Sequence, residues 1–240
     1  MSAFHLISDH LIIRPSLLHP PPTLLFLLDL FKLLFGFRGP RKVLLVGLSD
    51  AGKTICFTQL VARKFVNTVT SMKVTECPFD LNGKYRLAVD IPGFDRLRAK
   101  FWDDNKRSAN ALVFLVDSAA FVNNVRDVAD FLYTILADPA VTGRRVPILI
   151  AANKQDQPLA KSAAVIRKQL EKELQVIRET RAADLASTNE SGTAQALVGH
   201  ADKEFSFQDL RNRVSFVDCS CLEQGDHNLN ELRAWLKKNL

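Results

Sequence analysis

The sequence predicts an α/β fold: a mostly parallel, six-stranded sheet with one antiparallel edge strand and helices on both faces. From residue 41 onward, short apolar runs alternate with stretches whose apolar residues recur at helical spacing. Asn82-Gly83 separates two strand-like runs, which is a strong signal for an antiparallel hairpin. The chain has 240 residues, 47% of them hydrophobic, which is enough for one sizeable core and too few for two full domains.

Six runs have the character of strands, and four stretches have the character of helices. The expected strands are residues 42–47, 73–79, 84–90, 111–119, 146–156 and 213–220, and the expected helices are residues 52–64, 121–137, 159–179 and 229–240. Residues 181–203 are rich in Ala, Ser, Thr and Gly and show no periodicity. We therefore expect a mobile insertion there, within a domain that runs from residue 41 to 240.

Residues 1–40 form a separate N-terminal segment whose apolar run, residues 24–37, has three possible explanations. It is shorter than the roughly 20 residues that cross a bilayer, and Asp29 and Lys32 interrupt it. It could be a shortened membrane anchor with Arg38, Arg41 and Lys42 on the cytosolic side, a helix lying in the membrane interface, or an ordinary core helix. A cleaved signal peptide is disfavoured because no basic region precedes the run, and Ser2 excludes N-myristoylation.

The charge of the chain argues against one class of partner, and its cysteine content indicates the state of its thiols. The net charge of +6 is modest and spread along the chain, which argues against a direct, sequence-specific nucleic-acid partner. The four cysteines form no C-x-x-C pair, so we expect reduced thiols that pack as small apolar groups.

A glycine-bracketed loop follows the first strand and matches the phosphate-binding pattern G-x-x-x-x-G-K-[ST]. Glycines let backbone N–H groups turn toward phosphate oxygens, and the following helix adds a positive dipole. The lysine reaches the β- and γ-phosphates, while the final hydroxyl binds Mg²⁺. The loop consists of Gly47, Leu48, Ser49, Asp50, Ala51, Gly52, Lys53 and Thr54.

A second motif, Asn153-Lys154-Gln155-Asp156, follows the fifth strand and indicates which base is bound. The carboxylate of Asp156 can accept hydrogen bonds from N1–H and the exocyclic amine of guanine, donors that adenine does not present there. Asn153 would tie the base site to the phosphate loop, and the stem of Lys154 would cover the base. The carboxyl end of a strand in an open α/β sheet is where ligands bind.

The remaining candidate ligands lie in three other stretches. Asp90 and Gly93 form D-x-x-G, which supplies a carboxylate for the magnesium shell and an N–H that can sense a γ-phosphate. Ser220 and Cys221 end the last strand, where a backbone N–H can meet the guanine oxygen. A hydroxyl after the first helix should complete the magnesium shell of Thr54 and Asp90. Its position favours Ser71, with Thr70, Thr68 and Thr75 as alternatives.

Together these motifs resemble the Ras superfamily of small GTPases, and the loop "GLSDAGKT" is most similar to the Arf-like branch. The stretches "DIPGFDRLR", "FLVDSAAF", "ANKQDQPLAKSAAVIRKQLEKEL" and the insertion before "FSFQDL" resemble the beta-subunit family of the signal recognition particle receptor. That resemblance implies a P-loop, Ras-like GTPase domain that uses GTP and Mg²⁺. It also implies a place on the cytosolic face of the endoplasmic reticulum (ER) membrane and GTP-dependent binding of the receptor alpha subunit. Through that subunit it implies indirect association with the signal recognition particle, the ribosome and the translocon.

One residue departs from the pattern of active Ras-type enzymes. They place Gln directly after the D-x-x-G glycine to orient the attacking water, and this chain has Phe94. Since Phe cannot hydrogen-bond water, we expect very slow intrinsic hydrolysis and assign no catalytic residue. The alternatives are an Arf-like trafficking GTPase, disfavoured by Ser2, Phe94 and the insertion, and a P-loop kinase or ATPase, disfavoured by Asp156. By analogy with the fold, the effector surface should lie on residues 66–75 and 94–106.

Overall fold

The computed structural model describes residues 40–63, 71–187, 198–199, 203–222 and 229–240. Residues 40–240 form one compact unit. The expectations for residues 1–39, including the apolar run at 24–37, lie outside the described residues, so the proposed division of the chain stays a prediction. Within the described part, no helix combines the length and apolar character needed to cross a membrane.

The sheet has the predicted architecture. Its spatial order is β2-β3-β1-β4-β5-β6, and all neighbouring pairs are parallel except β2 with β3, which is antiparallel at one edge. The strands are β1 (Lys42–Val46), β2 (Thr75–Leu81), β3 (Lys84–Asp90), β4 (Ala109–Asp117), β5 (Ile148–Asn153) and β6 (Val214–Asp218). At the β2–β3 turn, Asn82 and Gly83 have φ of 56° and 74°, as a two-residue hairpin of type I′ requires.

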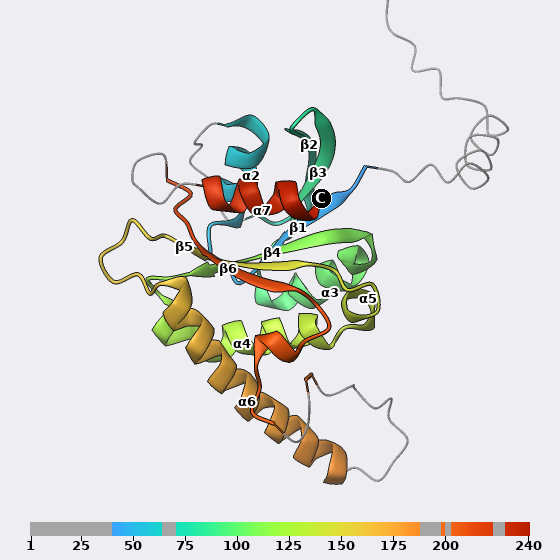
Figure 1. Ribbon diagram of the computed structural model, residues 1–240, viewed down its shortest axis with the longest axis vertical. Helices are drawn as coiled ribbons and strands as arrows, with labels where there is room; N and C mark the ends of the chain where they lie inside the picture. The colour runs from blue at the N-terminus through green and yellow to red at the C-terminus, as the bar shows by residue number, and fades with distance from the viewer. Residues whose placement is uncertain (1–39, 64–70, 188–197, 200–202, 223–228) are drawn as a thin grey trace, which may run out of the picture. The chain divides into compact units, whose positions relative to one another are not determined.

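Helices cover both faces of the sheet, as the sequence predicts (Figure 1). One face is covered by α2 (Lys53–Ala62) and α7 (Asn230–Asn239), the other by α3 (Asp95–Asn105), α4 (Phe121–Ala137), α5 (Pro139–Thr142) and α6 (Ala163–Ser187). Two apolar cores result, one on each face. The short 3-10 turns η1 (Lys106–Ser108) and η2 (Phe207–Asp209) complete the described elements.

Helix α6 extends beyond its predicted end and corrects the start of the expected insertion. Residues 181–187 are helical, although their composition assigned them to the insertion. Arg181 explains part of the difference, because it pairs with Asp130 of α4 at 2.8 Å and its guanidinium lies over the ring of Tyr133, 4.4 Å from the centroid. Residues 188–197 and 200–202 lie outside the described part of the chain.

The cysteines agree with the expectation of buried thiols at three of four positions. Cys56, Cys219 and Cys221 are buried and free, whereas Cys77 is free and half-buried on the edge strand β2. Among the described residues, no group of His, Cys, Asp and Glu is arranged to hold a metal ion by three such ligands.

Candidate functional site

The candidate site lies at the carboxyl edge of the sheet, where the loop between β1 and α2 packs against β4 and β5. Two glycines make this packing possible. A Cβ on Gly47, at φ 143°, would lie 2.3 Å from the carbonyl oxygen of Leu115, and one on Gly52, at φ 89°, would lie 2.2 Å from Nδ2 of Asn153. Larger residues would push the loop away from the sheet, so the glycines fix its position.

Lys53 is the cation at the centre of the loop. Its ammonium group donates to the carbonyl of Leu48 at 2.6 Å, and the side chain is buried. Burial lowers the pKa of Lys53 to about 8, although the nearby charges of Asp90 and Asp50 act to raise it. Gly93 lies against this group, since a Cβ there would be 2.5 Å from Nζ of Lys53. The D-x-x-G motif and the loop lysine therefore meet as expected.

Three side chains predicted as magnesium ligands come together from three elements. The hydroxyl of Thr54, on α2, donates to Oδ2 of Asp90 at 2.7 Å. Ser71, which lies between α2 and β2, contacts the Thr54 hydroxyl at 2.9 Å and donates to the same carboxylate oxygen at 3.2 Å. Two hydroxyls and a carboxylate are hard oxygen ligands of the kind that Mg²⁺ prefers.

Asp90 has an unsatisfied oxygen that fits a cation. The residue is 1% exposed at the end of β3, and its Oδ1 is buried with no hydrogen-bond partner. Burial raises the pKa of Asp90, against the opposing effects of the Thr54 hydrogen bond and the Lys53 charge. A buried carboxylate that has lost hydration is stabilised by a cation or a proton.

Asn153 joins the base-recognition motif to the phosphate loop. Its Nδ2 donates to the carbonyl of Ala51 at 2.9 Å, and its Oδ1 accepts from the backbone N–H of Cys221 at 3.1 Å. One buried side chain thus links the loop, β5 and the segment after β6. The Asp156 carboxylate accepts from the Ser220 hydroxyl at 2.5 Å, so both predicted base contacts lie beside each other.

Asp117 is a site residue that the motifs did not indicate. Its Oδ2 pairs with Nζ of Lys154 at 2.6 Å, and its Oδ1 accepts from the N–H groups of Ala119 and Ala120. Lys154 has φ of 68°, and the ion pair fixes its stem beside the cleft. The sequence signal was the polar end of β4, a position where ligand contacts are common in parallel sheets.

These residues surround a cleft of about 380 Å³. Its lining consists of Ser49, Asp50, Gly52, Lys53, Thr54, Ile55, Ser71, Pro92, Gly93 and Lys154. Gly47, Leu48 and Ala51 belong to the loop but are not among the lining residues. The predicted base contacts Asn153, Asp156, Ser220 and Cys221 do not line this cleft either; Asn153 connects them to the loop through the carbonyl of Ala51. A cleft with a buried lysine, a helix N-terminus and a carboxylate suits a nucleoside phosphate with its divalent cation.

The family comparison agrees with this chemistry. The family model for the signal recognition particle receptor beta subunit matches residues 39–214. The chain belongs to the signal recognition particle receptor beta-subunit family. The beta subunit of Mus musculus is 42% identical over 205 residues, which cover 82% of this chain and 76% of the mouse protein.

Solved structures of the family share the fold. A structure of the mammalian signal recognition particle receptor superimposes with a TM-score of 0.74 at 39% identity, covering 83% of this chain and 100% of that one. The beta subunit from Chaetomium thermophilum, described with GDP and Mg, gives a TM-score of 0.67 at 26% identity, covering 85% and 99%. The resemblance found in the motifs is therefore confirmed for the beta-subunit family and its GTPase fold.

Proposed function

We propose that this chain binds GTP and Mg²⁺ and, in the GTP-bound state, binds the alpha subunit of the signal recognition particle receptor at the ER membrane. The GTPase domain would face the cytosol and take part in co-translational targeting, with indirect contact to the signal recognition particle, the ribosome and the translocon. One observation carries the nucleotide part of the proposal: Thr54, Ser71 and Asp90 share hydrogen bonds beside the buried Lys53.

The residues at the cleft have separate roles toward the nucleotide. The N–H groups of the loop and Lys53 would hold the phosphates, and Asp156 would accept from the guanine edge. Thr54, Ser71 and Asp90 would hold Mg²⁺, which supplies positive charge between the phosphate oxygens when it is bound. The Chaetomium relative described with GDP and Mg supports binding of a guanine nucleotide and of Mg²⁺.

Ser71 provides a physical route from nucleotide to partner. It lies in the segment between α2 and β2, part of the predicted effector surface, and its hydroxyl contacts both Thr54 and Asp90. A ligand that takes over these contacts would change how the segment is held. On the second predicted surface, Phe94 is 40% exposed at the start of α3, next to Gly93. An alpha subunit that contacts both segments would read the state of the site.

Capture of the receptor alpha subunit tests the proposal. The full chain is loaded with GTP or GDP, and the amount of alpha subunit retained is measured. We expect much greater retention with GTP, and Asp156→Ala should reduce it at limiting GTP. Asp209→Ala, an acid exposed on η2, is a control that should behave as the unchanged chain. Equal retention of the alpha subunit with GDP and GTP would refute the regulatory role. In a separate titration of the same chain with fluorescent nucleotides, tighter binding of ATP than of GTP would refute the assignment of guanine to Asp156.

Membrane attachment has its own test. The basic residues Arg38, Arg41 and Lys42 suit a cytosolic flank, and the family match supports attachment, whereas the apolar run 24–37 is short for a span. We expect the full chain to stay with microsomal membranes after carbonate extraction. Release into the carbonate supernatant would exclude an integral anchor.

A further inference from the structure

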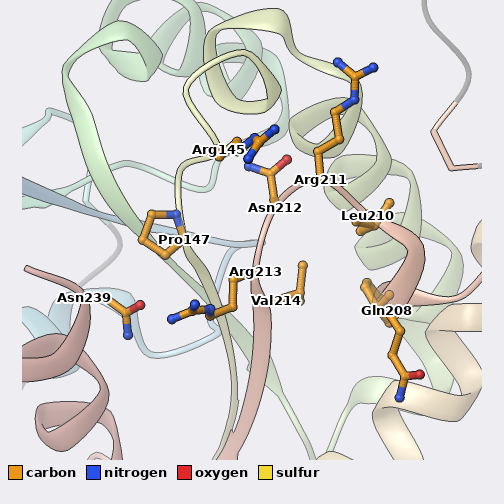
Figure 2. Close-up of a pocket in the computed structure, with 10 residues that line it drawn as sticks. Arg145, Pro147, Gln208, Leu210, Arg211, Asn212, Arg213, Val214 and Asn239 are labelled. Carbon is orange, nitrogen blue, oxygen red and sulfur yellow. The ribbon is translucent and has the colours of Figure 1, made fainter.

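A second cleft, of about 620 Å³, opens at the amino edge of the sheet, away from the nucleotide site (Figure 2). Its lining comes from the turn before β5, the segment η2–β6 and the end of α7. The residues are Arg145, Pro147, Phe207, Gln208, Leu210, Arg211, Asn212, Arg213, Val214 and Asn239. Three of the ten are arginines, and none is acidic.

Hydrogen bonds hold the two arginine-bearing segments together. Asn212 is buried, and its Nδ2 donates to the carbonyls of Val141 at 3.1 Å and Val146 at 2.9 Å. The N–H of Ile148 donates to the carbonyl of Arg213 at 2.9 Å. Arg145 has φ of 50°, a conformation that few residues other than Gly, Asn and Asp adopt readily. The turn that carries Arg145 is therefore held beside the segment that carries Arg211 and Arg213.

The three arginines are exposed and form no ion pair with any residue in the described ranges. Other arginines of the domain do: Arg98 pairs with Asp95, and Arg181 pairs with Asp130. Arg145, Arg211 and Arg213 instead line one cleft, from which their guanidinium groups extend in different directions (Figure 2). A guanidinium without a carboxylate partner is well suited to bind phosphate, to which it can donate two parallel hydrogen bonds.

The position of the cleft in the fold indicates which kind of phosphate group could reach it. The chain joins the domain at Pro40, and β1 begins there at Lys42. Because β1, β4, β5 and β6 are parallel, their amino ends share one edge, and β6 lies three strand spacings, about 14 Å, from β1. The segment that carries the possible membrane anchor thus leads into the same edge as the arginine cleft. The phosphate-binding loop lies at the opposite, carboxyl edge.

We propose that the cleft of Arg145, Arg211 and Arg213 binds anionic lipid headgroups, so that the amino edge faces the bilayer and the nucleotide edge faces away. This inference rests on the proposed membrane attachment. Each basic residue near an anionic membrane surface contributes about 1 kcal/mol, so three together would strengthen contact on the order of 100-fold. RNA is less suited, because the one aromatic lining residue, Phe207, is buried and offers no stacking surface.

Hydrogen exchange of the full chain on vesicles tests the inference. One set of vesicles is pure phosphatidylcholine, and the other contains phosphatidylinositol as well. We expect residues 143–147 and 208–213 to exchange several-fold more slowly on the anionic vesicles. The variant Arg145→Gln/Arg211→Gln/Arg213→Gln should lose that difference while it binds GTP normally, since the substitutions lie at the opposite edge.

A matched variant controls for net charge. Arg126→Gln/Lys168→Gln/Lys172→Gln removes the same three charges from exposed positions on α4 and α6 and should keep the lipid-dependent difference. Equal exchange on both vesicles would overturn the inference but leave membrane attachment intact. Failure of the chain to float with either vesicle would overturn both. If residues 143–147 and 208–213 exchange more slowly when RNA is added, but are not slowed by the anionic vesicles, the cleft belongs to a nucleic acid and the lipid proposal is overturned.

Discussion

Asp90 shows at the level of one residue why the site calls for a cation. Its Oδ2 already accepts from two hydroxyls, and its buried Oδ1 accepts from none. Burial raises the pKa of the carboxyl, so its charged form is unfavourable until positive charge arrives. Lys53 supplies part of that charge, and a divalent ion would supply the rest. Falling pH should therefore weaken Mg²⁺ binding by protonating Asp90.

The Ser71 hydroxyl should matter more for GTP than for GDP. If it binds Mg²⁺ in the triphosphate state, Ser71→Ala removes a hydrogen-bonding or metal contact to a charged group, worth about 1.5–3 kcal/mol. We expect Mg²⁺-dependent GTP binding to weaken roughly 10- to 100-fold. Nucleotide titration with and without Mg²⁺ measures the effect. Thr75→Ala, at an exposed hydroxyl on β2, is the control, and equal weakening of GTP and GDP binding would reject the role.

Lys53 should make nucleotide affinity depend on pH. The phosphates bind the protonated amine, whose pKa in the free site is about 8 because the group is buried. As pH rises through 8 the free protein loses this proton, so binding must take it up again and affinity falls. From pH 7 to 8.5 a pKa of 8 gives about a fourfold loss.

Titration of GTP binding between these two pH values measures the loss. The matched variant is Lys53→Arg, whose guanidinium stays charged throughout. Its affinity ratio between pH 7 and 8.5 should be close to one, whatever its absolute affinity. A ratio for the unchanged chain that is also close to one would show that Lys53 keeps its proton in the free site.

At the scale of elements, local signals predicted most of the fold, and long-range contacts account for what they missed. Asn82-Gly83 specified the hairpin, and the apolar spacing from Phe121 to Ala137 gave α4 with its observed bounds. Helix α3 was not expected, because the apolar periodicity of its sequence is weak. In the structure Trp102 is the one residue of this helix that is buried. Asp117 escaped notice because its partner Lys154 is 37 residues away. By contrast, a motif marked the phosphate loop directly, whereas Ser71 was favoured only by its distance from Thr54, and its role as a ligand stays a prediction.

Asp138 should be essential for holding α3 against α5. Its Oδ2 accepts from the indole N–H of Trp102 at 3.1 Å and pairs with Lys106 at 2.9 Å, and its Oδ1 caps α5 through Ala140 at 2.8 Å. Asp138→Ala would remove the cap and leave a buried donor unpaired, at a cost of about 2–4 kcal/mol in the free energy of unfolding.

Urea unfolding measures this change. Asp103→Ala is the control, because Asp103 pairs with the same Lys106 at 2.6 Å but is 64% exposed. Exposed pairs contribute about 0–1 kcal/mol, so this variant should be nearly as stable as the unchanged chain. If the two variants lost equal stability, the surface pair and not the buried Trp102 contact would be the important one.

At the scale of the whole molecule, the two edges of one sheet carry different tasks. The carboxyl edge holds the candidate nucleotide site, with Ser71 and Gly93 of its lining, and the amino edge carries the arginine cleft and the start of β1. A parallel sheet separates such edges by the length of its strands, about 17–20 Å. A partner could therefore engage the nucleotide edge while the other edge contacts a membrane.

Phe94 determines how long this molecule would stay in its GTP state. It begins α3 beside Gly93, where its carbonyl accepts from the N–H groups of Leu97 and Arg98, and its ring is 40% exposed. A phenyl ring cannot orient the attacking water, as the Gln of active enzymes does. We expect single-turnover hydrolysis by the isolated full chain at or below the order of 10⁻⁴ s⁻¹.

That rate would make GTP a long-lived ligand that maintains the partner-binding state. Single-turnover assays with and without the receptor alpha subunit separate slow chemistry in the chain from activation by the partner. Phe94→Ala is the informative variant, because removing a ring that contributes nothing to water positioning should leave the rate of the isolated chain unchanged. Fast turnover by the isolated chain would show that another group positions the water and that the cleft is a working hydrolase. A large fall in rate with Phe94→Ala would show that Phe94 itself supports hydrolysis.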